Sequence, residues 1–116
     1  MRSTGPTQRV RQLVLERDGY RCARCGRHIH NGPYSLQHRK ARGMGGTKDP
    51  AINSPANLVT LCGDGVRGCH GLIEANREEA REKGFTVRQT QDPSTVPVHC
   101  WDGTYYLNQD GGRDHP

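Results

Sequence analysis

Large aromatic and apolar side chains are scarce in this sequence. Its 116 residues include one Phe, one Trp and four Tyr, and apolar residues make up 31% of the chain. The usual share in a globular domain, which counts Gly as well, is about 45–50%. So few large side chains cannot build an extensive dry core. We therefore expect one small domain that disulfides or a bound metal ion help to stabilise.

Long apolar runs are absent as well. The longest apolar stretch is far shorter than the ~20 residues that span a bilayer, so we expect no transmembrane segment and no membrane partner. Residues 1–7 contain no apolar run, from which we expect no signal peptide and a cytoplasmic location. Long coiled coils are excluded because 15 Gly and 7 Pro interrupt the chain.

Cysteines are the candidate stabilising element. Cys22 and Cys25 form a C-x2-C pair, Cys62 and Cys69 form a looser pair, and Cys100 stands apart. In the reducing compartment that we expect, metal ligation is favoured over disulfides. Zinc binds four thiolate or imidazole ligands in a tetrahedron, and a C-x2-C turn presents two of them. The spacing therefore predicts a structural Zn2+ held by the two cysteine pairs.

Other uses of these residues stay open. Disulfides or unligated thiols are alternatives, and either His28 or His30 could replace one sulfur. The six residues between Cys62 and Cys69 include three glycines, which would allow the loop between these cysteines to curl around one ion. The sequence lacks both the ~12-residue spacing of a C2H2 finger and the H-x-E and P-C-x-x-C elements of a zinc deaminase.

Periodicity and turn residues indicate an α+β domain. Apolar residues recur at helical spacing between Thr7, a plausible N-cap, and the stop signal Asp18-Gly19. Gly84 would cap a second helix. The expected elements are helices over 7–17 and 69–83, strands over 34–38 and 57–61, a long loop over 39–55, and a hairpin of strands 96–101 and 104–107. We expect disorder in 1–6 and 110–116, one domain over 7–84, and C-terminal strands over 85–109 packed on it.

Three polar residues lie on successive predicted elements in a characteristic order. His38 ends the first predicted strand, Asn57 begins the second, and His70 lies on the next helix. This order, with its flanking segments VLERDG, CARCG, GG, NLVTLC and CH, resembles the HNH endonucleases. The resemblance covers residues 8–84, and residues 42–46 look like the small HNH proteins of tailed bacteriophages.

The resemblance implies a ββα-metal (His-Me finger) fold and metal-dependent hydrolysis of DNA phosphodiesters. His38 would be the general base, since imidazole can accept a proton near neutral pH. His70 and Glu74, one helical turn apart, would hold a catalytic divalent metal, and a carboxylate there suits Mg2+ or Mn2+. Ni2+ is a further candidate. Asn57 would either hydrogen-bond across the loop to hold the His38 strand or contact the metal.

One position departs from the family pattern. The residue before the general base is commonly Asp, Glu or His and often ligates the metal, whereas here it is Gln37. A neutral amide oxygen is a poorer ligand for a hard dication than a carboxylate, so Gln37 is a doubtful ligand. This departure keeps a second interpretation open, a noncatalytic zinc-stabilised DNA-binding or assembly module on an HNH scaffold.

The charge balance indicates DNA as the partner. A formal net charge of +5 favours nonspecific, salt-sensitive binding without base recognition, so we expect low sequence specificity. We also expect a monomer. The resemblance to phage proteins implies a role in genome packaging with the terminase large subunit, in the cytoplasm of a bacterial host cell. The residues expected to contact DNA are Arg39, Lys40, Arg42, Arg67, Arg77 and Arg81.

Taken singly, each of these residues has a plainer interpretation. His38 would be a polar surface residue, Asn57 a turn residue, and His70 a neighbour or ligand of the zinc site. Glu74 would face solvent on a charged helix, and the arginines would only keep the protein soluble. The ordered set, rather than any one member, favours the nuclease.

Overall fold

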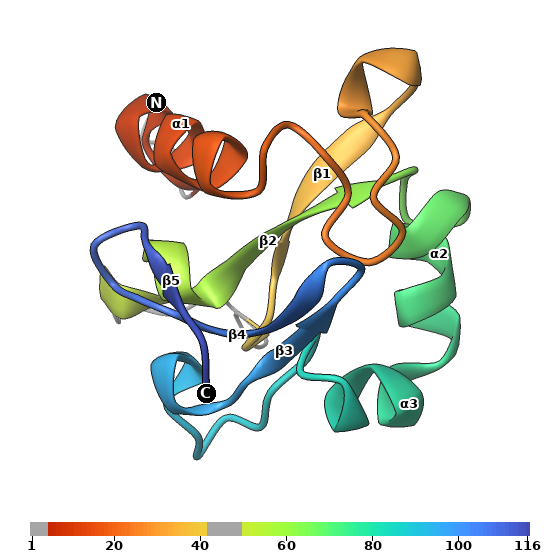
Figure 1. The fold of residues 1–116 in the computed structure, drawn as a ribbon. Helices are drawn as coiled ribbons and strands as arrows, with labels where there is room; N and C mark the ends of the chain where they lie inside the picture. The colour runs from red at the N-terminus through yellow and green to blue at the C-terminus, as the bar shows by residue number, and fades with distance from the viewer. Residues whose placement is uncertain (1–4, 42–49) are drawn as a thin grey trace.

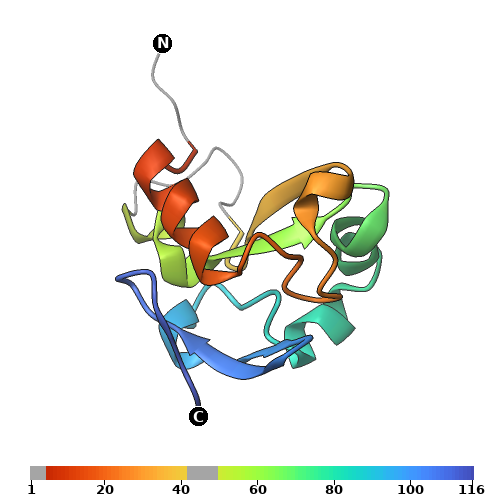
Figure 2. The same ribbon diagram turned by 45° about the horizontal axis from the view of Figure 1, so that its top comes forward.

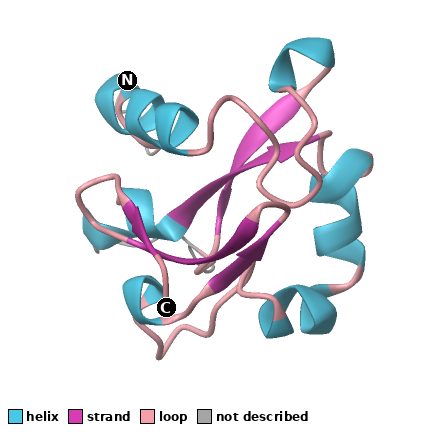
Figure 3. Ribbon diagram, in the orientation of Figure 1, coloured by secondary structure: helices cyan, strands magenta, loops and turns pink. Residues whose placement is uncertain are grey.

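Two small antiparallel sheets, with helices packed around them, make up the computed structural model, which describes residues 5–41 and 50–116 (Figures 1 and 3). The predicted α+β class is confirmed. Within the described ranges, no helix is long and apolar enough to cross a membrane. The helices and strands are α1 (Gln8–Arg17), β1 (Tyr34–His38), β2 (Leu58–Cys62), α2 (Gly68–Ala75), α3 (Arg77–Glu82), β3 (Val98–Cys100), β4 (Gly103–Leu107) and β5 (Arg113–Asp114).

Strand β2 lies at the centre of the fold. It pairs with β1 in a register that places His38 opposite Leu58, and all five of its residues are buried. Helices α1 and α2 pack on this sheet, while the β3–β4–β5 sheet lies beneath it in Figure 2. A strand covered on both sides can be apolar throughout rather than alternating. Its Val59 and Leu61 join a core that includes Ile73, Phe85, Val98, Tyr105 and Leu107.

Helix α1 begins and ends where the sequence predicts. Oγ1 of Thr7 accepts a hydrogen bond from the N–H of Val10 (3.2 Å). Asp18 is the C-cap, and Gly19 follows it with a φ of 67°. The Asp18 carboxylate also accepts a hydrogen bond from the N–H of Thr60 (3.0 Å). The residue that ends α1 therefore also links it to β2.

The second predicted helix, 69–83, is broken into α2 and α3. The break occurs at Asn76, which leaves the helical region (φ −133°, ψ 61°) and whose side chain donates to the carbonyl of Leu72 (3.0 Å). Asparagine side chains compete in this way with backbone hydrogen bonds. Gly84, with a φ of 83°, ends α3 as predicted and turns the chain so that Phe85 enters the core.

The C-terminal hairpin is present as β3 and β4, and order continues beyond it. We predicted disorder for 110–116, but β5 pairs with β4 there. Arg113 accounts for this difference, because it forms an ion pair with Asp102 (3.0 Å) and lies 3.9 Å from the ring centroid of Tyr105. Such contacts between distant residues are not visible in a polar, glycine-rich sequence. Of the other segment predicted to be disordered, residues 1–4 lie outside the described part of the chain.

Candidate functional site

Four cysteine side chains converge on one point. The sulfur atoms of Cys22, Cys25, Cys62 and Cys69 all lie within 4.8 Å of one another, and all four are free thiols. The sulfurs of Cys25 and Cys62 are 3.7 Å apart. A tetrahedral ion with metal–sulfur bonds of about 2.3 Å separates its sulfurs by about 3.8 Å. The predicted cluster is therefore confirmed as a candidate structural metal site, to which Cys100 does not belong.

Two tight turns present these cysteines. In the first, the N–H of Cys22 donates to the carbonyl of Arg27 (2.8 Å), and Gly26 has a φ of 81°. In the second, Gly63 has a φ of 89°, and a Cβ atom there would lie 2.0 Å from the carbonyl oxygen of Arg67. Only glycine fits both positions without strain, so the second loop curls as predicted.

The alternative histidine ligands are not part of the cluster. His28 and His30 stack on each other with ring centroids 6.0 Å apart, and His30 stacks on Tyr20 at 6.1 Å. Among the residues that the structure describes, no histidine joins the four sulfurs. Four thiolates are therefore the donor set.

Burial and a neighbouring arginine determine the charge of the cluster. Burial raises the pKa of Cys22 and of Cys69, so without a metal ion both are neutral thiols at physiological pH. Nη1 of Arg24 lies 3.5 Å from Sγ of Cys69. Its positive charge offsets part of the negative charge that thiolates bring to a bound ion. Burial also raises the pKa of Cys100 to about 12, which makes that thiol unreactive.

The tryptophan of the chain packs on the first cysteine turn. The N–H of Trp101 donates to the carbonyl of Ala23 (2.9 Å), and a Cβ atom at Gly26 would lie 2.7 Å from the indole ring. The guanidinium carbon of Arg21 is 5.6 Å from the ring centroid. The β3–β4 hairpin is thus linked directly to the candidate metal site.

A second group of polar side chains lies where β1 faces α2. Ser35 and Gln37 share a face of β1 because strand residues alternate, and His70 and Glu74 lie one turn apart on α2. The hydroxyl of Ser35 is 2.7 Å from Nδ1 of His70. Oε1 of Glu74 is 3.8 Å from Nε2 of His70 and 3.4 Å from Nε2 of Gln37. The structure therefore brings together three of the predicted metal-site residues and adds Ser35 to them.

His38 lies on the other face of β1, one residue after Gln37. Its Nε2 is 2.7 Å from Oδ1 of Asn53, in the 3-10 turn η2 (Pro50–Asn53). Within the described part of the chain, no hydrogen bond joins His38 to Gln37, His70 or Glu74. The predicted general base and the predicted metal ligands thus lie on opposite sides of the end of β1.

Asn57 joins the two ends of the loop that follows β1. Its side chain accepts a hydrogen bond from the N–H of Lys40 (2.7 Å) and donates to the carbonyls of Lys40 (3.2 Å) and Ile52 (2.8 Å). These are the loop-spanning bonds that we expected of this residue. The other expectation, a direct metal contact, does not fit, because Asn57 is fully buried and its side chain is bonded to backbone.

Sequence reasoning missed Ser35 and Asn53. Ser35 lies two residues before Gln37 on the same strand, so the alternation of the strand could have singled it out. Asn53 lies near the end of the long loop predicted over 39–55, where no periodic pattern distinguishes one polar residue from another. Only the fold brings Asn53 to His38.

Arg39 is not placed to contact DNA, contrary to the prediction. Its side chain is completely buried. Burial, together with nearby Arg17, lowers the pKa of Arg39 to about 10. Its guanidinium links the end of β1 to the turn before β2 and to the segments after α3. It donates, at 2.6–2.9 Å, to the carbonyl oxygens of Ala56, Gly84, Pro93 and Val96.

The other predicted DNA contacts differ in exposure. Arg67, Arg77 and Arg81 are exposed, although Arg77 forms an ion pair with Glu74 (3.1 Å). Lys40 is half-buried, and Arg42 lies outside the described residues. Exposed guanidinium groups suited to phosphate therefore come from the turn before α2 and from α3.

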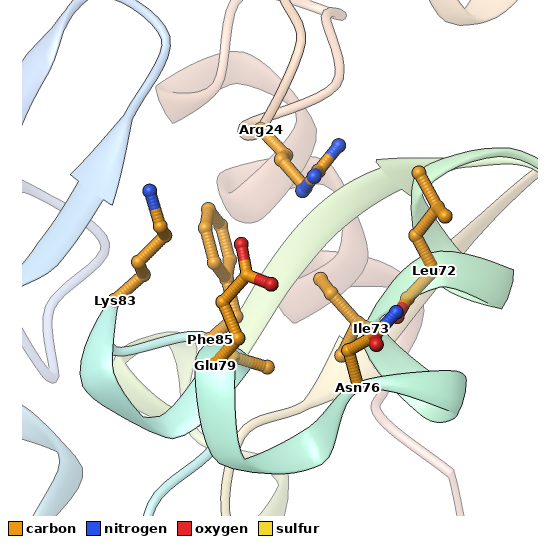
Figure 4. A pocket seen from close by; sticks show the side chains of 8 residues that line it. Arg24, Leu72, Ile73, Asn76, Glu79, Lys83 and Phe85 are labelled. Atoms are coloured by element: carbon orange, nitrogen blue, oxygen red, sulfur yellow. The ribbon is translucent and has the colours of Figure 1, made fainter.

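A small pocket between the first cysteine turn and the α2–α3 pair lies apart from these groups (Figure 4). Arg24 reaches it from the cysteine turn, and Leu72 lines it from α2. Among the described residues that line this pocket, none is a predicted catalytic residue or metal ligand. The pocket adds no group to the candidate active site.

No protein-family model matches the chain, and no curated protein or solved structure matches it either. The geometry of the site and the order of its residues in the sequence are therefore the grounds for a functional proposal.

Proposed function

We propose that this protein is a metal-dependent DNA endonuclease of the HNH type, with His38 as general base. The observation that carries the proposal is the arrangement at the end of β1. Gln37, His70 and Glu74 gather on one side of the strand, and His38 is held on the other by a hydrogen bond. β1 supplies Gln37 and His38, and α2 supplies His70 and Glu74, which is the order along the chain that the resemblance to HNH nucleases implies.

His70 and Glu74 are the proposed protein ligands of a catalytic divalent ion. Nδ1 of His70 would donate to the hydroxyl of Ser35, 2.7 Å away, which leaves the lone pair of Nε2 on the side of Glu74. An imidazole and a carboxylate suit Mg2+, Mn2+ or Ni2+. Such an ion, when bound, stabilises negative charge on the phosphate and the leaving oxygen.

His38 is the proposed proton acceptor for the attacking water. Its ring is half-buried and held by Asn53, so the imidazole has a defined orientation at the end of the strand. A neutral imidazole accepts a proton at working pH. The water oxygen then attacks phosphorus in line with the departing 3′ oxygen.

Zinc is the proposed ion of the cysteine cluster. Four cysteine sulfurs that lie within 4.8 Å of one another are a donor set that Zn2+ uses in structural sites. Cys62 ends β2 and Cys69 lies in the first turn of α2. An ion bound by both would hold the strand and the helix that carry the candidate active site.

Duplex DNA is the proposed substrate, bound with little sequence preference. The net charge of +5 and the exposed Arg67 and Arg81 support phosphate contacts, which carry no base information. The resemblance to small HNH proteins of tailed bacteriophages supports action with a terminase large subunit in genome packaging. Co-purification of the two proteins from a bacterial host tests that partnership.

Cleavage of supercoiled plasmid tests the proposal. Wild type and His38→Ala are compared with Mg2+, Mn2+, Ni2+ or EDTA, after circular dichroism shows both to be folded. We expect metal-dependent nicking by the wild type and a loss of about 100-fold or more in His38→Ala, with DNA binding unchanged. His99→Ala, which removes an exposed histidine of β3, is the matched control and should cleave as the wild type does. Equal cleavage by His38→Ala and wild type would refute the general-base role.

Gln37 favours a second candidate function, a noncatalytic DNA-binding or assembly module. Its amide nitrogen faces the Glu74 carboxylate, where a carboxylate at position 37 would have supplied another hard ligand. A folded, metal-loaded protein that binds DNA but cleaves with none of the metals would establish this alternative. Gln37→Asp is then expected to gain metal-dependent nicking.

A further inference from the structure

His38 makes one side-chain hydrogen bond within the described part of the chain, and its partner is Asn53. The distance between Nε2 of His38 and Oδ1 of Asn53 is 2.7 Å. An amide oxygen only accepts hydrogen bonds, so Nε2 must carry the proton. Because a neutral imidazole has a single N–H, Nδ1 of His38 then keeps its lone pair.

We infer that Asn53 is a positioning residue that holds His38 in the Nε2–H tautomer and presents Nδ1 as the atom that accepts the proton from water. The inference rests on the proposed nuclease function and names the acting atom of its general base. The hydrogen bond made by one ring nitrogen decides which nitrogen of a neutral histidine is protonated. Without Asn53, the ring would populate both tautomers and more than one orientation, and only part of the molecules would have a competent base.

The backbone around both residues is fixed by Asn57. Its side chain donates to the carbonyl of Ile52, the residue before Asn53 (2.8 Å). It also bonds the N–H and the carbonyl of Lys40, two residues after His38 (2.7 and 3.2 Å). Asn57 therefore sets the position of η2 relative to the end of β1, and Asn53 extends that alignment to the imidazole.

The two imidazoles of the candidate site are held through opposite nitrogens. His70 is bonded through Nδ1 to Ser35, which leaves Nε2 toward Glu74, whereas His38 is bonded through Nε2. In each case an uncharged oxygen forms a hydrogen bond with one ring nitrogen. The other nitrogen stays available, to bind the metal in His70 and to accept a proton in His38. A neutral partner orients the base without adding a negative charge beside the site that must accept a phosphate.

Nitrogen NMR tests the tautomer independently of cleavage. Long-range 1H–15N spectra of the zinc-loaded, full-length protein, at a pH where His38 is neutral, distinguish protonated from unprotonated ring nitrogens. We expect protonation of wild-type His38 at Nε2 and a mixture of tautomers in Asn53→Ala. Asn53→Asp keeps an oxygen acceptor and should retain the Nε2–H form. Protonation of wild-type His38 at Nδ1 would overturn the inference, and this result decides it even where Asn53→Ala is unstable.

Plasmid cleavage measures the consequence for the reaction. We expect Asn53→Ala to lower kcat about 10- to 100-fold with KM for DNA changed less than about twofold, because the base is misaligned while the DNA contacts remain. Asn53→Asp should recover only part of the loss, because its carboxylate orients the ring but adds a negative charge beside the site that must accept a phosphate. Asn108→Ala is the matched control, since its side chain bonds Asp114 in the C-terminal segment, and it should match the wild type in both measurements.

The two measurements separate failure of this inference from failure of the proposed function. A wild type that cleaves, with Asn53→Ala equal to it in tautomer and in kcat, refutes the positioning role alone. A wild type that fails to cleave DNA with every metal tested, although its tautomer depends on Asn53, refutes the nuclease and with it the catalytic use of this hydrogen bond.

Discussion

The hydroxyl of Ser35 lies 2.7 Å from Nδ1 of His70 and joins the first strand of the candidate site to its helix. A hydrogen bond to one imidazole nitrogen leaves the other available to a metal and fixes the plane of the ring. Ser35 therefore directs Nε2 of His70 toward Glu74, 3.8 Å away. This contact makes a residue with no role in the sequence analysis a determinant of the proposed metal site.

Ser35→Ala is expected to weaken binding of the catalytic metal about 10- to 100-fold, as removal of a group that orients a metal ligand does. The measurement is the Mg2+ or Mn2+ concentration that gives half-maximal plasmid nicking. Ser35→Thr keeps the hydroxyl and should stay close to the wild type. An unchanged half-maximal concentration in folded Ser35→Ala would show that His70 does not need this bond.

Cys22→Ser, or removal of the structural ion by a chelator, is expected to unfold the protein. A structural zinc contributes about 10–16 kcal/mol, whereas a whole domain is stable by about 5–15 kcal/mol. Trp101 packs against Gly26 in the first cysteine turn, so its fluorescence should change as the turn opens. Cys100→Ser should keep both metal and fold, as measured by native mass spectrometry and thermal melting. An unaltered melting temperature in Cys22→Ser would refute a structural metal.

Arg39→Met is expected to destabilise the protein by about 3–5 kcal/mol, because four carbonyl oxygens lose their donor and three of these hydrogen bonds are buried. In a domain of this size such a loss lowers Tm by more than about 10 °C, which thermal unfolding followed by circular dichroism measures. Arg81→Met, exposed on α3, should change stability by less than about 0.5 kcal/mol. A folded Arg39→Met of normal stability but weak DNA binding would reinstate Arg39 as a DNA contact.

Arg67→Gln and Arg81→Gln are each expected to weaken DNA binding equally for all sequences. Each lost phosphate contact reduces the slope of log K against log salt by about 0.9, which fluorescence anisotropy of a labelled duplex at several salt concentrations detects. Arg113→Gln removes a guanidinium already paired with Asp102 and should leave the slope unchanged. If Arg67→Gln and Arg81→Gln both kept the salt slope of the wild type, as Arg113→Gln should, the DNA would have to bind on another face of the protein.

Features set by near neighbours could be predicted. The bounds of β1, the Thr7 cap of α1 and the Gly84 end of α3 all agree with the sequence analysis. Each depends on a few adjacent residues: the turn-forming segment Asn31-Gly32-Pro33 before β1, a side-chain oxygen three residues from an N–H, and a backbone angle that favours glycine.

Features set by distant partners could not be predicted. Arg39 reads as a surface cation beside Lys40, but its carbonyl partners lie up to 57 residues away. The C-terminal segment reads as a polar tail, yet Arg113 reaches Asp102, 11 residues earlier. Neither contact has a periodic signal, because the partners come from separate elements.

Spacing along the chain was enough to anticipate the cysteine cluster, since a C-x2-C turn and a glycine-containing loop leave few ways to arrange four sulfurs around one ion. The order of His38, Asn57 and His70 along the chain was likewise visible in the sequence alone. Which atom of each histidine is held, and by which residue, depended on tertiary packing. The partners Asn53 and Ser35 stand 15 and 35 residues from their histidines, and hydrogen bonds at such separations exist only after the strands and helix have packed.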